Sequence, residues 1–218
     1  MRLIAFDFDG TLSDSEMTVL LAERAGVAEE VADITERAMN DELSYAESLY
    51  QRAALLEGLS AEDVSDAFDR VRIRPGAAEL IARLREAGHH VAILTGGFER
   101  GVEAALAREG VDVDTIIANR LPQSGGRLTG DAEGPLIEGT KDTALEELAE
   151  EVDLPMADTV AIGDGANDLP MLEVAGLSVG FVPKPAVRPS CDVVVASMAR
   201  LGSVFEGYRV LPTAETPE

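Results

Sequence analysis

The chain has 218 residues, of which 18 are basic and 41 are acidic, so its formal net charge is −23. This charge disfavours nucleic acids and anionic membranes as partners, because both are themselves negative. Apolar residues make up 46% of the chain, and no apolar run approaches the length of a membrane span, so we expect a globular protein. The single cysteine, Cys191, excludes an intrachain disulfide and fits a reducing cytoplasm, where we expect the protein to work.

The basic residues are nearly all arginine, because Lys141 and Lys184 are the only lysines. An acidic, lysine-poor composition resembles that of cytoplasmic proteins from salt-accumulating halophiles, in which high salt screens the repulsion between surface charges. The sequence therefore favours a halophilic protein. An ordinary acidic protein of a mesophile is the alternative.

Short apolar runs alternate with amphipathic helical patterns, which is typical of a parallel sheet with helices on its faces. The expected strands are residues 2–6, 89–94, 114–118, 158–164, 177–181 and 192–196. The expected helices are residues 76–87, 99–109, 140–152 and 168–174. Residues 120–131, around the Gly125-Gly126 turn, predict a β-hairpin. The predicted fold class is α/β, with a doubly wound parallel sheet.

Residues 13–72 break this alternation, because they show helical periodicity and contain no strand candidate. We therefore expect an α/β core of residues 1–13 and 74–218 with a helical cap, or lid, of residues 14–73 inserted after the first strand. Such a lid would lie over the carboxyl end of that strand, where open α/β sheets bind their ligands. The tail, residues 211–218, is expected to be frayed.

Two carboxylates, Asp7 and Asp9, follow the first strand directly and are succeeded by Gly10 and Thr11. Residues two apart on a strand point to the same face, so these carboxylates would repel each other unless something offsets their charge. Polar groups also follow other strands or begin the helices after them. These groups are Thr95, Gly96, Lys141, Asp164, Asn167 and Asp168.

In a parallel sheet these strand ends meet at one edge. Asp7, Asp9 and Asp164 would then form an oxygen-rich site suited to Mg²⁺, which prefers few carboxylates together with water and phosphate oxygens. The cation would offset the repulsion between the carboxylates. The groups expected to surround a phosphate are the Thr95 hydroxyl, the Gly96 amide and Lys141.

A carboxylate beside a magnesium ion and a held phosphate indicates attack on phosphorus and an aspartyl-phosphate intermediate. Asp7, directly at the strand end, is the better nucleophile. Asp9 is then placed to protonate the leaving oxygen and later to deprotonate the water that cleaves the intermediate. The alternative is that residues 7–11 form a surface turn with aspartates as turn formers. The polar groups at Thr95, Lys141 and Asp164, which follow in order along the chain, disfavour this alternative.

The chain resembles the haloacid dehalogenase-like phosphatases through residues 7–11 (DFDGT), Thr95, Lys141 and residues 163–168 (GDGAND). The resemblance implies that Asp7 is the phosphorylated nucleophile and Asp9 the acid/base. It also implies that Asp7, the Asp9 backbone carbonyl and Asp164 hold Mg²⁺, with Asn167 beside the phosphate and Asp168 in support. Dehalogenases of the family lack an acid two residues after the nucleophile, so Asp9 favours phosphate-ester chemistry.

Within that family the chain resembles the phosphoserine phosphatases through Glu16, residues 48–52 (SLYQR), residues 55–59 (LLEGL) and the hairpin segment. This implies that Glu16 binds the substrate ammonium, that Arg52 binds its carboxylate through a planar two-point contact, and that Met39 and Tyr45 line the lid. L-phosphoserine would be the small-molecule substrate, in the last step of serine biosynthesis. We expect a monomer or a homodimer.

The residues that would recognise the substrate could instead have purely structural roles. Ser13-x-x-Glu16 is also a capping box, in which Glu16 only returns to the helix N-terminus. Arg52 could be a solvated helix residue paired with Ser48 or Glu47. The subfamily often has serine at the position of Thr95 and phenylalanine at that of Tyr45, whose hydroxyl has no evident partner in the sequence. We expect Lys184 to be structural or peripheral.

Two other functions remain open at this point. A phosphatase or phosphotransferase for another small phosphate would share the core and differ in the lid. A signalling phospho-acceptor domain also has an aspartate at a strand end, magnesium and a lysine, but it needs neither Asp9 nor a lid of some sixty residues, so it is disfavoured.

Overall fold

A computed structural model of the chain describes residues 1–40 and 42–213. Within them, six parallel strands form one sheet in the order β3-β2-β1-β6-β7-β8. The strands are β1 (Leu3–Phe6), β2 (His90–Phe98), β3 (Thr115–Asn119), β6 (Thr159–Gly163), β7 (Leu177–Phe181) and β8 (Val193–Val195). The predicted hairpin forms a separate antiparallel pair, β4 (Gln123–Ser124) and β5 (Arg127–Leu128).

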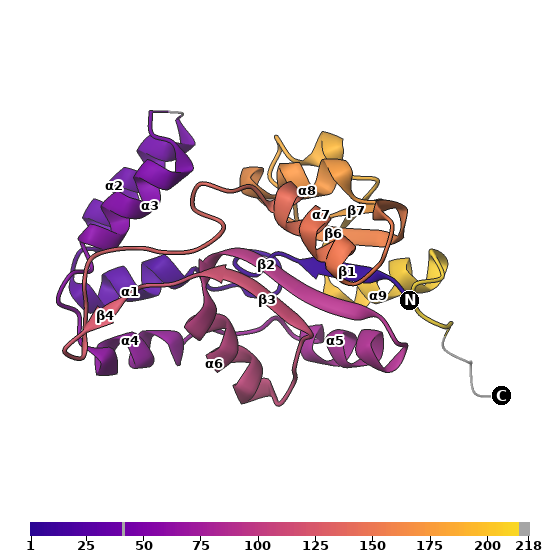
Figure 1. Cartoon of the computed structure of the whole chain (residues 1–218), viewed down its shortest axis with the longest axis horizontal. Helices are drawn as coiled ribbons and strands as arrows, with labels where there is room; N and C mark the ends of the chain where they lie inside the picture. Colours follow the sequence, from indigo (N-terminus) through magenta and orange to yellow (C-terminus); the bar gives the residue numbers. More distant parts are fainter. Residues whose placement is uncertain (41, 214–218) are drawn as a thin grey trace.

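Helices cover both faces of the sheet, as Figure 1 shows. The helices α5 (Ala77–Glu86), α6 (Glu99–Glu109) and α9 (Met198–Gly207) lie on one face, and α7 (Lys141–Glu151) and α8 (Leu169–Val174) on the other. Strand β1 contributes to both cores, because Ile4 and Phe6 belong to the first and Leu3 and Ala5 to the second. A parallel sheet buried on both faces needs such uniformly apolar strands, and the predicted α/β fold class is confirmed.

Apart from shifts of one residue at the ends of elements, the sequence predictions differ from the structure in three places. Strand β2 continues to Phe98, four residues beyond its predicted end at Leu94. Helix α9 was not predicted. Fraying from residue 211 onward is wrong for Leu211, which is 3% exposed because it packs in the core beside Val210. Residues 212 and 213 are exposed, and residues 214–218 of that prediction lie outside the described residues.

We refer to residues 14–73 as the insertion, and its described residues form four helices between β1 and α5. They are α1 (Met17–Ala25), α2 (Ala28–Met39), α3 (Tyr45–Ala54) and α4 (Ala61–Phe68). Figure 1 shows α2 and α3 standing beside one end of the sheet. Apolar residues of the insertion, such as Leu21 and Leu49, belong to the same buried cluster as Phe8 and Phe98 of the sheet region. The insertion therefore packs on the sheet through a continuous core.

Hydrogen bonds fix the insertion at its entry, its exit and its far end. Ser13 pairs with Ile73 as an isolated antiparallel bridge, and the Arg74 N–H donates to the Leu12 carbonyl at 2.8 Å. The loop between α3 and α4 pairs with the hairpin, since Leu128 exchanges backbone hydrogen bonds of 2.9 Å with residues 58 and 59. None of the helices in the described ranges has both the length and the apolar character of a membrane span.

Candidate active site

The winding of the sheet reverses around β1, which lies between β2 on one side and β6 on the other. In open α/β sheets the crevice beyond the strand ends at such a point is the usual ligand site. Asp7 lies there, 3% exposed, and its N–H donates to the Ile162 carbonyl of β6 at 2.8 Å. The sheet itself therefore fixes the backbone of Asp7.

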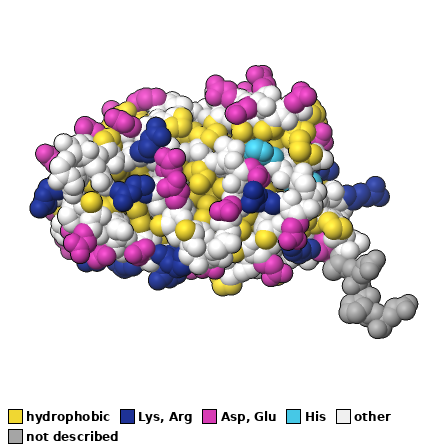
Figure 2. All heavy atoms as spheres, turned by 60° about the horizontal axis from the view of Figure 1, so that its bottom comes forward, with side chains coloured by type: hydrophobic (Ala, Val, Ile, Leu, Met, Phe, Trp, Pro, Cys, Tyr) yellow, Lys and Arg dark blue, Asp and Glu magenta, His cyan; other side chains and the backbone are white. Residues whose placement is uncertain are grey.

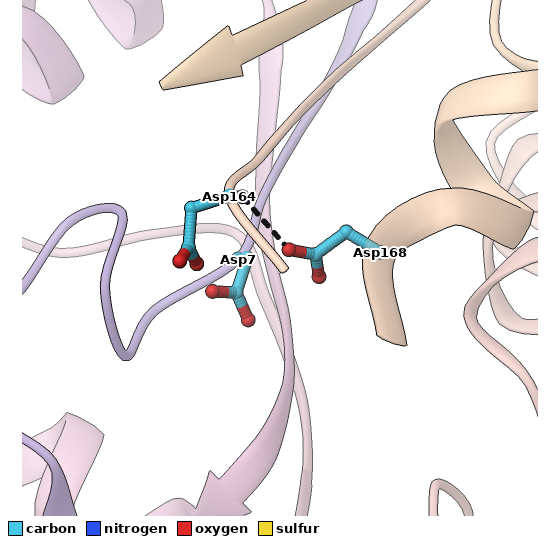
Figure 3. Close-up of side chains that lie close together, drawn as sticks. All are labelled: Asp7, Asp164 and Asp168. Carbon is cyan, nitrogen blue, oxygen red and sulfur yellow. Dashed lines mark hydrogen bonds between the residues drawn. The ribbon is translucent and has the colours of Figure 1, made fainter. Parts of the chain in front are cut away.

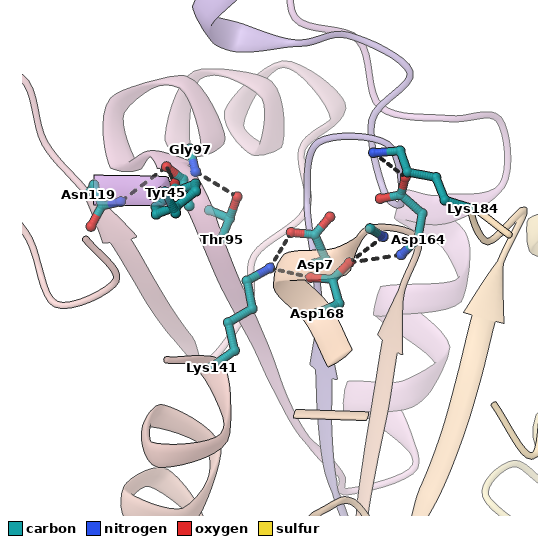
Figure 4. A network of polar contacts seen from close by, with 11 residues as sticks. Asp7, Tyr45, Thr95, Gly97, Asn119, Lys141, Asp164, Asp168 and Lys184 are labelled. Carbon is teal, nitrogen blue, oxygen red and sulfur yellow. Dashed lines mark hydrogen bonds and ion pairs between the residues drawn. The ribbon is translucent and has the colours of Figure 1, made fainter. Parts of the chain in front are cut away.

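Lys141 joins two of the buried carboxylates. Its Nζ lies 2.6 Å from Asp7 Oδ1 and 2.6 Å from Asp168 Oδ1 (Figure 4). The other oxygen of Asp168 accepts from the N–H groups of Asp164 and Gly165, both at 2.9 Å. Both oxygens of Asp168 are thus occupied, and this side chain holds the turn after β6 in place.

Asp7, Asp164 and Asp168 form an acidic cluster, with one carboxylate oxygen of each within 4.8 Å of the others (Figure 3). Two cations face it, Lys141 and Lys184, whose Nζ lies 3.5 Å from Asp164 Oδ2. Three carboxylates against two ammonium groups leave one negative charge, so the cluster could hold a metal ion. Because Asp168 is fully hydrogen-bonded, Asp7 and Asp164 are the better ligands.

The pKa values in this cluster follow from burial and crowding. Burial and the charge of Asp168 raise the pKa of Asp7 to about 7, against the opposing effect of Lys141. Burial alone would lower the pKa of Lys141, but the adjacent Asp168 and Asp7 raise it above its usual value. Lys141 therefore stays charged, and a further cation beside Asp7 would favour the ionised carboxylate.

Gly10 and Arg74 shape the turn that follows Asp7. Gly10 has a φ of +89°, and a Cβ there would lie 2.6 Å from Asp164 Oδ1, so only glycine fits. The Arg74 guanidinium donates to the carbonyls of Gly10 and Thr11 at 3.1 Å each and lies 5.2 Å from the centre of the Phe181 ring. Nothing in the sequence around Arg74 indicates this contact.

Asp9 lies in this turn and not on the strand, because β1 ends at Phe6 and the chain then buries Phe8 completely. The idea that Asp7 and Asp9 share one strand face is therefore wrong. Asp9 Oδ2 accepts from the Met17 N–H at 3.5 Å, while Oδ1 is buried without a hydrogen-bond partner in the described part of the chain. Burial, with Glu16 and Asp7 nearby, raises the pKa of Asp9 well above its usual value.

Of the predicted phosphate-binding residues, Thr95 and Gly96 lie in the last part of β2, Asn167 follows β6, and Lys141 begins α7. Thr95 is 1% exposed, and its Oγ1 accepts from the Gly97 N–H at 3.0 Å. The Gly96 carbonyl accepts from Tyr45 Oη at 3.0 Å and from Asn119 Nδ2 at 3.1 Å. Asn167 is exposed in the turn before α8. Asn119 was not among the predicted site residues. Its position at the end of β3 is the sequence feature that could have indicated it.

The predicted substrate-binding residues lie on the insertion. Glu16 precedes α1 as its N-cap residue and makes no side-chain cap hydrogen bond, so the capping-box alternative is wrong. The Ser13 hydroxyl donates instead to the Arg72 carbonyl at 2.8 Å. Met39 ends α2 with 74% of its surface exposed, so its contact with a substrate stays a prediction.

Arg52, on α3, is half-buried and donates through Nε to the Ser48 carbonyl at 3.2 Å. Within residues 1–40 and 42–213 it forms no ion pair. Burial lowers the pKa of Arg52, while the nearby Tyr45 and Glu16 raise it. A half-buried guanidinium with unused donors is suited to bind a carboxylate. Lys184, expected to be structural or peripheral, borders the acidic cluster through Asp164.

Residues 4–173 match the family described as haloacid dehalogenase-like hydrolase. The chain therefore belongs to the haloacid dehalogenase-like hydrolases and is an enzyme. It is similar over nearly its whole length to phosphoserine phosphatases, as its motifs predicted. It is 52% identical over 210 residues to that of Halobacterium salinarum, covering 96% of this chain and 100% of the relative. It is 40% identical over 195 residues to that of Methanocaldococcus jannaschii, covering 89% and 92%.

Two solved structures extend this similarity to three dimensions. One is a phospho-aspartyl intermediate analogue of phosphoserine phosphatase, with a TM-score of 0.84, 39% identity and coverage of 95% of this chain and 98% of the other. The second is a substrate-bound phosphoserine phosphatase complex, with a TM-score of 0.84, 38% identity and coverage of 95% and 97%.

Proposed function

We propose that this enzyme hydrolyses L-phosphoserine to L-serine and phosphate, as the last step of serine biosynthesis. The observation that carries the proposal is the buried Asp7, held by Lys141 at the strand end and flanked by Asp164. A fixed carboxylate at a phosphate site is suited to covalent catalysis. The names of the relatives support the choice of phosphoserine over other phosphate esters.

The reaction would take two steps at Asp7. A carboxylate oxygen of Asp7 attacks phosphorus, the bond to the serine oxygen breaks, and Asp9 donates its proton to that oxygen. Water then attacks phosphorus, Asp9 takes a proton from it, and the phosphate leaves as Asp7 is freed. The raised pKa of Asp9 supports this role, because a proton donor must begin the reaction protonated.

The acidic cluster fits a hard cation with oxygen ligands, and we propose Mg²⁺. Asp7, the Asp9 backbone carbonyl and Asp164 would hold it, and when bound it would neutralise charge between the carboxylates and the phosphate. Thr95, the Gly96 amide, Lys141 and Asn167 would bind the phosphate oxygens. Asp168 would keep Lys141 and the turn after β6 in position.

The insertion, residues 14–73, would act as the lid and supply the contacts to the serine part of the substrate. Glu16 would bind the ammonium group and Arg52 the carboxylate, with Met39 and Tyr45 lining the lid. The proximity of Glu16 and Arg52 supports this division, since each contributes to the pKa of the other. We further propose a cytoplasmic enzyme adapted to high salt, on the basis of its charge of −23 and its similarity to a halophile's protein.

The test is phosphate release from L-phosphoserine with Mg²⁺ and, separately, with a chelator. We expect many turnovers with the metal and a loss of at least about 100-fold without it, in line with the charge that the metal would neutralise. The same assay would be run on a panel of other phosphate esters, namely O-phosphoethanolamine, 3-phosphoglycerate and p-nitrophenyl phosphate, with and without an added amino-acid acceptor. The Asp7→Asn variant, purified in the same way, measures the phosphate release that comes from contaminating phosphatases.

Preference for another ester would contradict the proposal that L-phosphoserine is the substrate. Transfer of phosphate to the acceptor would favour the alternative that the enzyme is a phosphotransferase. A single turnover that leaves a phosphorylated protein would favour the signalling domain. Undiminished activity in Asp7→Asn would contradict the covalent mechanism.

A further inference from the structure

The hydroxyl of Tyr45 contacts the catalytic core and not only the interior of the insertion. Tyr45 begins α3, and its Oη lies 3.0 Å from the Gly96 carbonyl. The same carbonyl accepts from Asn119 Nδ2 at 3.1 Å. Figure 4 shows Tyr45 and Asn119 close together beside Thr95 and Gly97. Two donors, one from the insertion and one from β3, thus hold a single carbonyl at the end of β2.

A carbonyl held in this way also fixes the amide on the other side of its peptide bond. The peptide between Gly96 and Gly97 is planar, so fixing its C=O fixes the direction of its N–H. That N–H, of Gly97, donates to Thr95 Oγ1 at 3.0 Å. A hydroxyl that accepts one hydrogen bond still has its own proton to donate. Thr95 is therefore left with a donor to offer to a phosphate oxygen.

The close approach of Tyr45 needs a glycine at position 96. A Cβ there would lie 2.2 Å from Tyr45 Oη, so any other residue would displace the ring. Tyr45 keeps 38% of its surface exposed, but burial of its hydroxyl raises its pKa above the usual value. The hydroxyl therefore remains a proton donor throughout the physiological pH range.

We propose that Tyr45 is a positioning residue for phosphate binding: its hydroxyl fixes the Gly96–Gly97 peptide and, through it, the proton of the Thr95 hydroxyl. This rests on the proposed function in one respect, namely that Thr95 binds the phosphate. Because Tyr45 belongs to the insertion and Thr95 to the sheet, the contact links the position of the insertion to the orientation of a phosphate donor. Phenylalanine at position 45 could fill the space but could not make this link.

The test is a double-mutant cycle of Tyr45→Phe with Thr95→Val, which removes the second hydroxyl and keeps its shape. The loss of one neutral hydrogen bond predicts that Tyr45→Phe lowers kcat/KM about 3–10-fold. It should also weaken the binding of inorganic phosphate, measured by calorimetry, by a similar factor. In the Thr95→Val background the same change should have less than a twofold effect on both quantities, because the group that it orients is gone.

Tyr50→Phe is the matched control, since Tyr50 lies on the same helix with 43% of its surface exposed. We expect less than a twofold change for it, and unchanged thermal unfolding for both tyrosine variants would exclude a loss of folded protein. Equal effects of Tyr45→Phe in the two backgrounds would overturn the proposal, and so would no effect in either.

Each measurement is made with L-phosphoserine and with p-nitrophenyl phosphate, because the phosphate group is common to both. Failure of the wild-type enzyme on L-phosphoserine alone would count against the proposed substrate. The cycle on the aryl ester and the calorimetry with inorganic phosphate would still decide the role of Tyr45.

Discussion

Two aspartates near the end of β1 have the same side chain and different surroundings. Asp7 faces Lys141 at 2.6 Å, whereas Asp9 has one buried oxygen without a hydrogen-bond partner in the described ranges. Burial raises the pKa of both, but only Asp7 has a cation in contact with it. Contact with Lys141 therefore favours the ionised form more strongly at Asp7 than at Asp9, and this difference has the direction that the proposed nucleophile and proton donor require.

Asp9→Asn should lower the rate on L-phosphoserine by about 10²–10⁴-fold, the usual contribution of general acid–base help. With p-nitrophenyl phosphate the first step should be affected less, because its leaving group needs no proton. A burst of nitrophenolate followed by slow turnover would report this. Asp14→Asn, at an exposed carboxylate five residues on, is the control and should retain activity. An unchanged rate in Asp9→Asn would remove Asp9 from the mechanism.

Arg52 tests the substrate, because its guanidinium would grip a group that only some esters carry. Arg52→Ala should lower kcat/KM for L-phosphoserine. The loss should correspond to about 2–4 kcal/mol of transition-state binding, which is the scale of breaking a buried charged pair. Activity on O-phosphoethanolamine, which has the amine without the carboxylate, should change much less. Arg52→Lys should recover only part of the loss, because a lysine lacks the planar two-point geometry.

The half-exposed Arg37, which lies in the last turn of α2, provides the control for a lost charge on the insertion. Arg37→Ala should leave both esters unaffected. An equal loss on the two esters in Arg52→Ala would mean that Arg52 does not contact the carboxylate, and the substrate would become an unspecified phosphate ester.

At the scale of elements, one imidazole joins the first strand to the segment after the last helix. His89 Nδ1 accepts from the Arg2 N–H at 3.0 Å, just before β1, and Nε2 contacts the Val210 carbonyl after α9. Since Nδ1 must accept, Nε2 carries the proton and donates it, and the ring is neutral. If Nδ1 were protonated, its N–H and the Arg2 N–H would face each other, and neither could accept a hydrogen bond.

Burial lowers the pKa of His89 below 6.5, with the N-terminus and Arg2 adding to the effect. The unfolded chain then binds more protons than the folded one just below pH 6.5, so this contribution to stability is lost as the pH falls through that region. The free energy of unfolding of wild type and His89→Gln, measured by denaturant at pH 8 and pH 5, should differ most at pH 8. The same difference at both pH values would contradict the prediction.

The whole molecule is dominated by negative charge. Figure 2 shows Asp and Glu side chains spread over the face that it displays, with fewer Lys and Arg side chains between them. Most of the ion pairs that the described residues form are half-exposed or exposed, such as Arg70 with Glu23 and Arg37 with Glu42. Exposed pairs contribute little, so they offset only a small part of the repulsion that a charge of −23 creates.

The melting temperature should therefore rise as potassium chloride is added, because the screening length falls from about 10 Å at 0.1 M to about 3 Å at 1 M. The larger part of the rise should occur below about 1 M, where the screening length changes most. Adding sucrose at low ionic strength is the control for a general effect of cosolutes. A flat melting temperature across the salt range would contradict the proposed adaptation to salt and leave the enzymatic proposal intact.

The sequence by itself determined the element types around the site and the set of candidate residues. Uniformly apolar strands followed by Asp7, Thr95 and Asp164 predict a parallel sheet with polar groups at one edge, because strand periodicity and turn chemistry are local properties. The helical character of residues 14–73 was predictable for the same reason. The meeting of the strand ends followed from the rule that parallel strands align.

Only the tertiary structure decided how these groups use their atoms. No local sequence pattern shows that both oxygens of Asp168 bind Lys141 and the turn after β6. The same holds for the position of Asp9 beyond the end of β1 and for the hydrogen bond from the Tyr45 hydroxyl to the Gly96 carbonyl. Each depends on residues that are distant in sequence and adjacent in space. A hydrogen bond needs its two atoms within about 3 Å, and the packing of the insertion and helices on the sheet sets such distances, whereas sequence periodicity fixes only which face a side chain occupies.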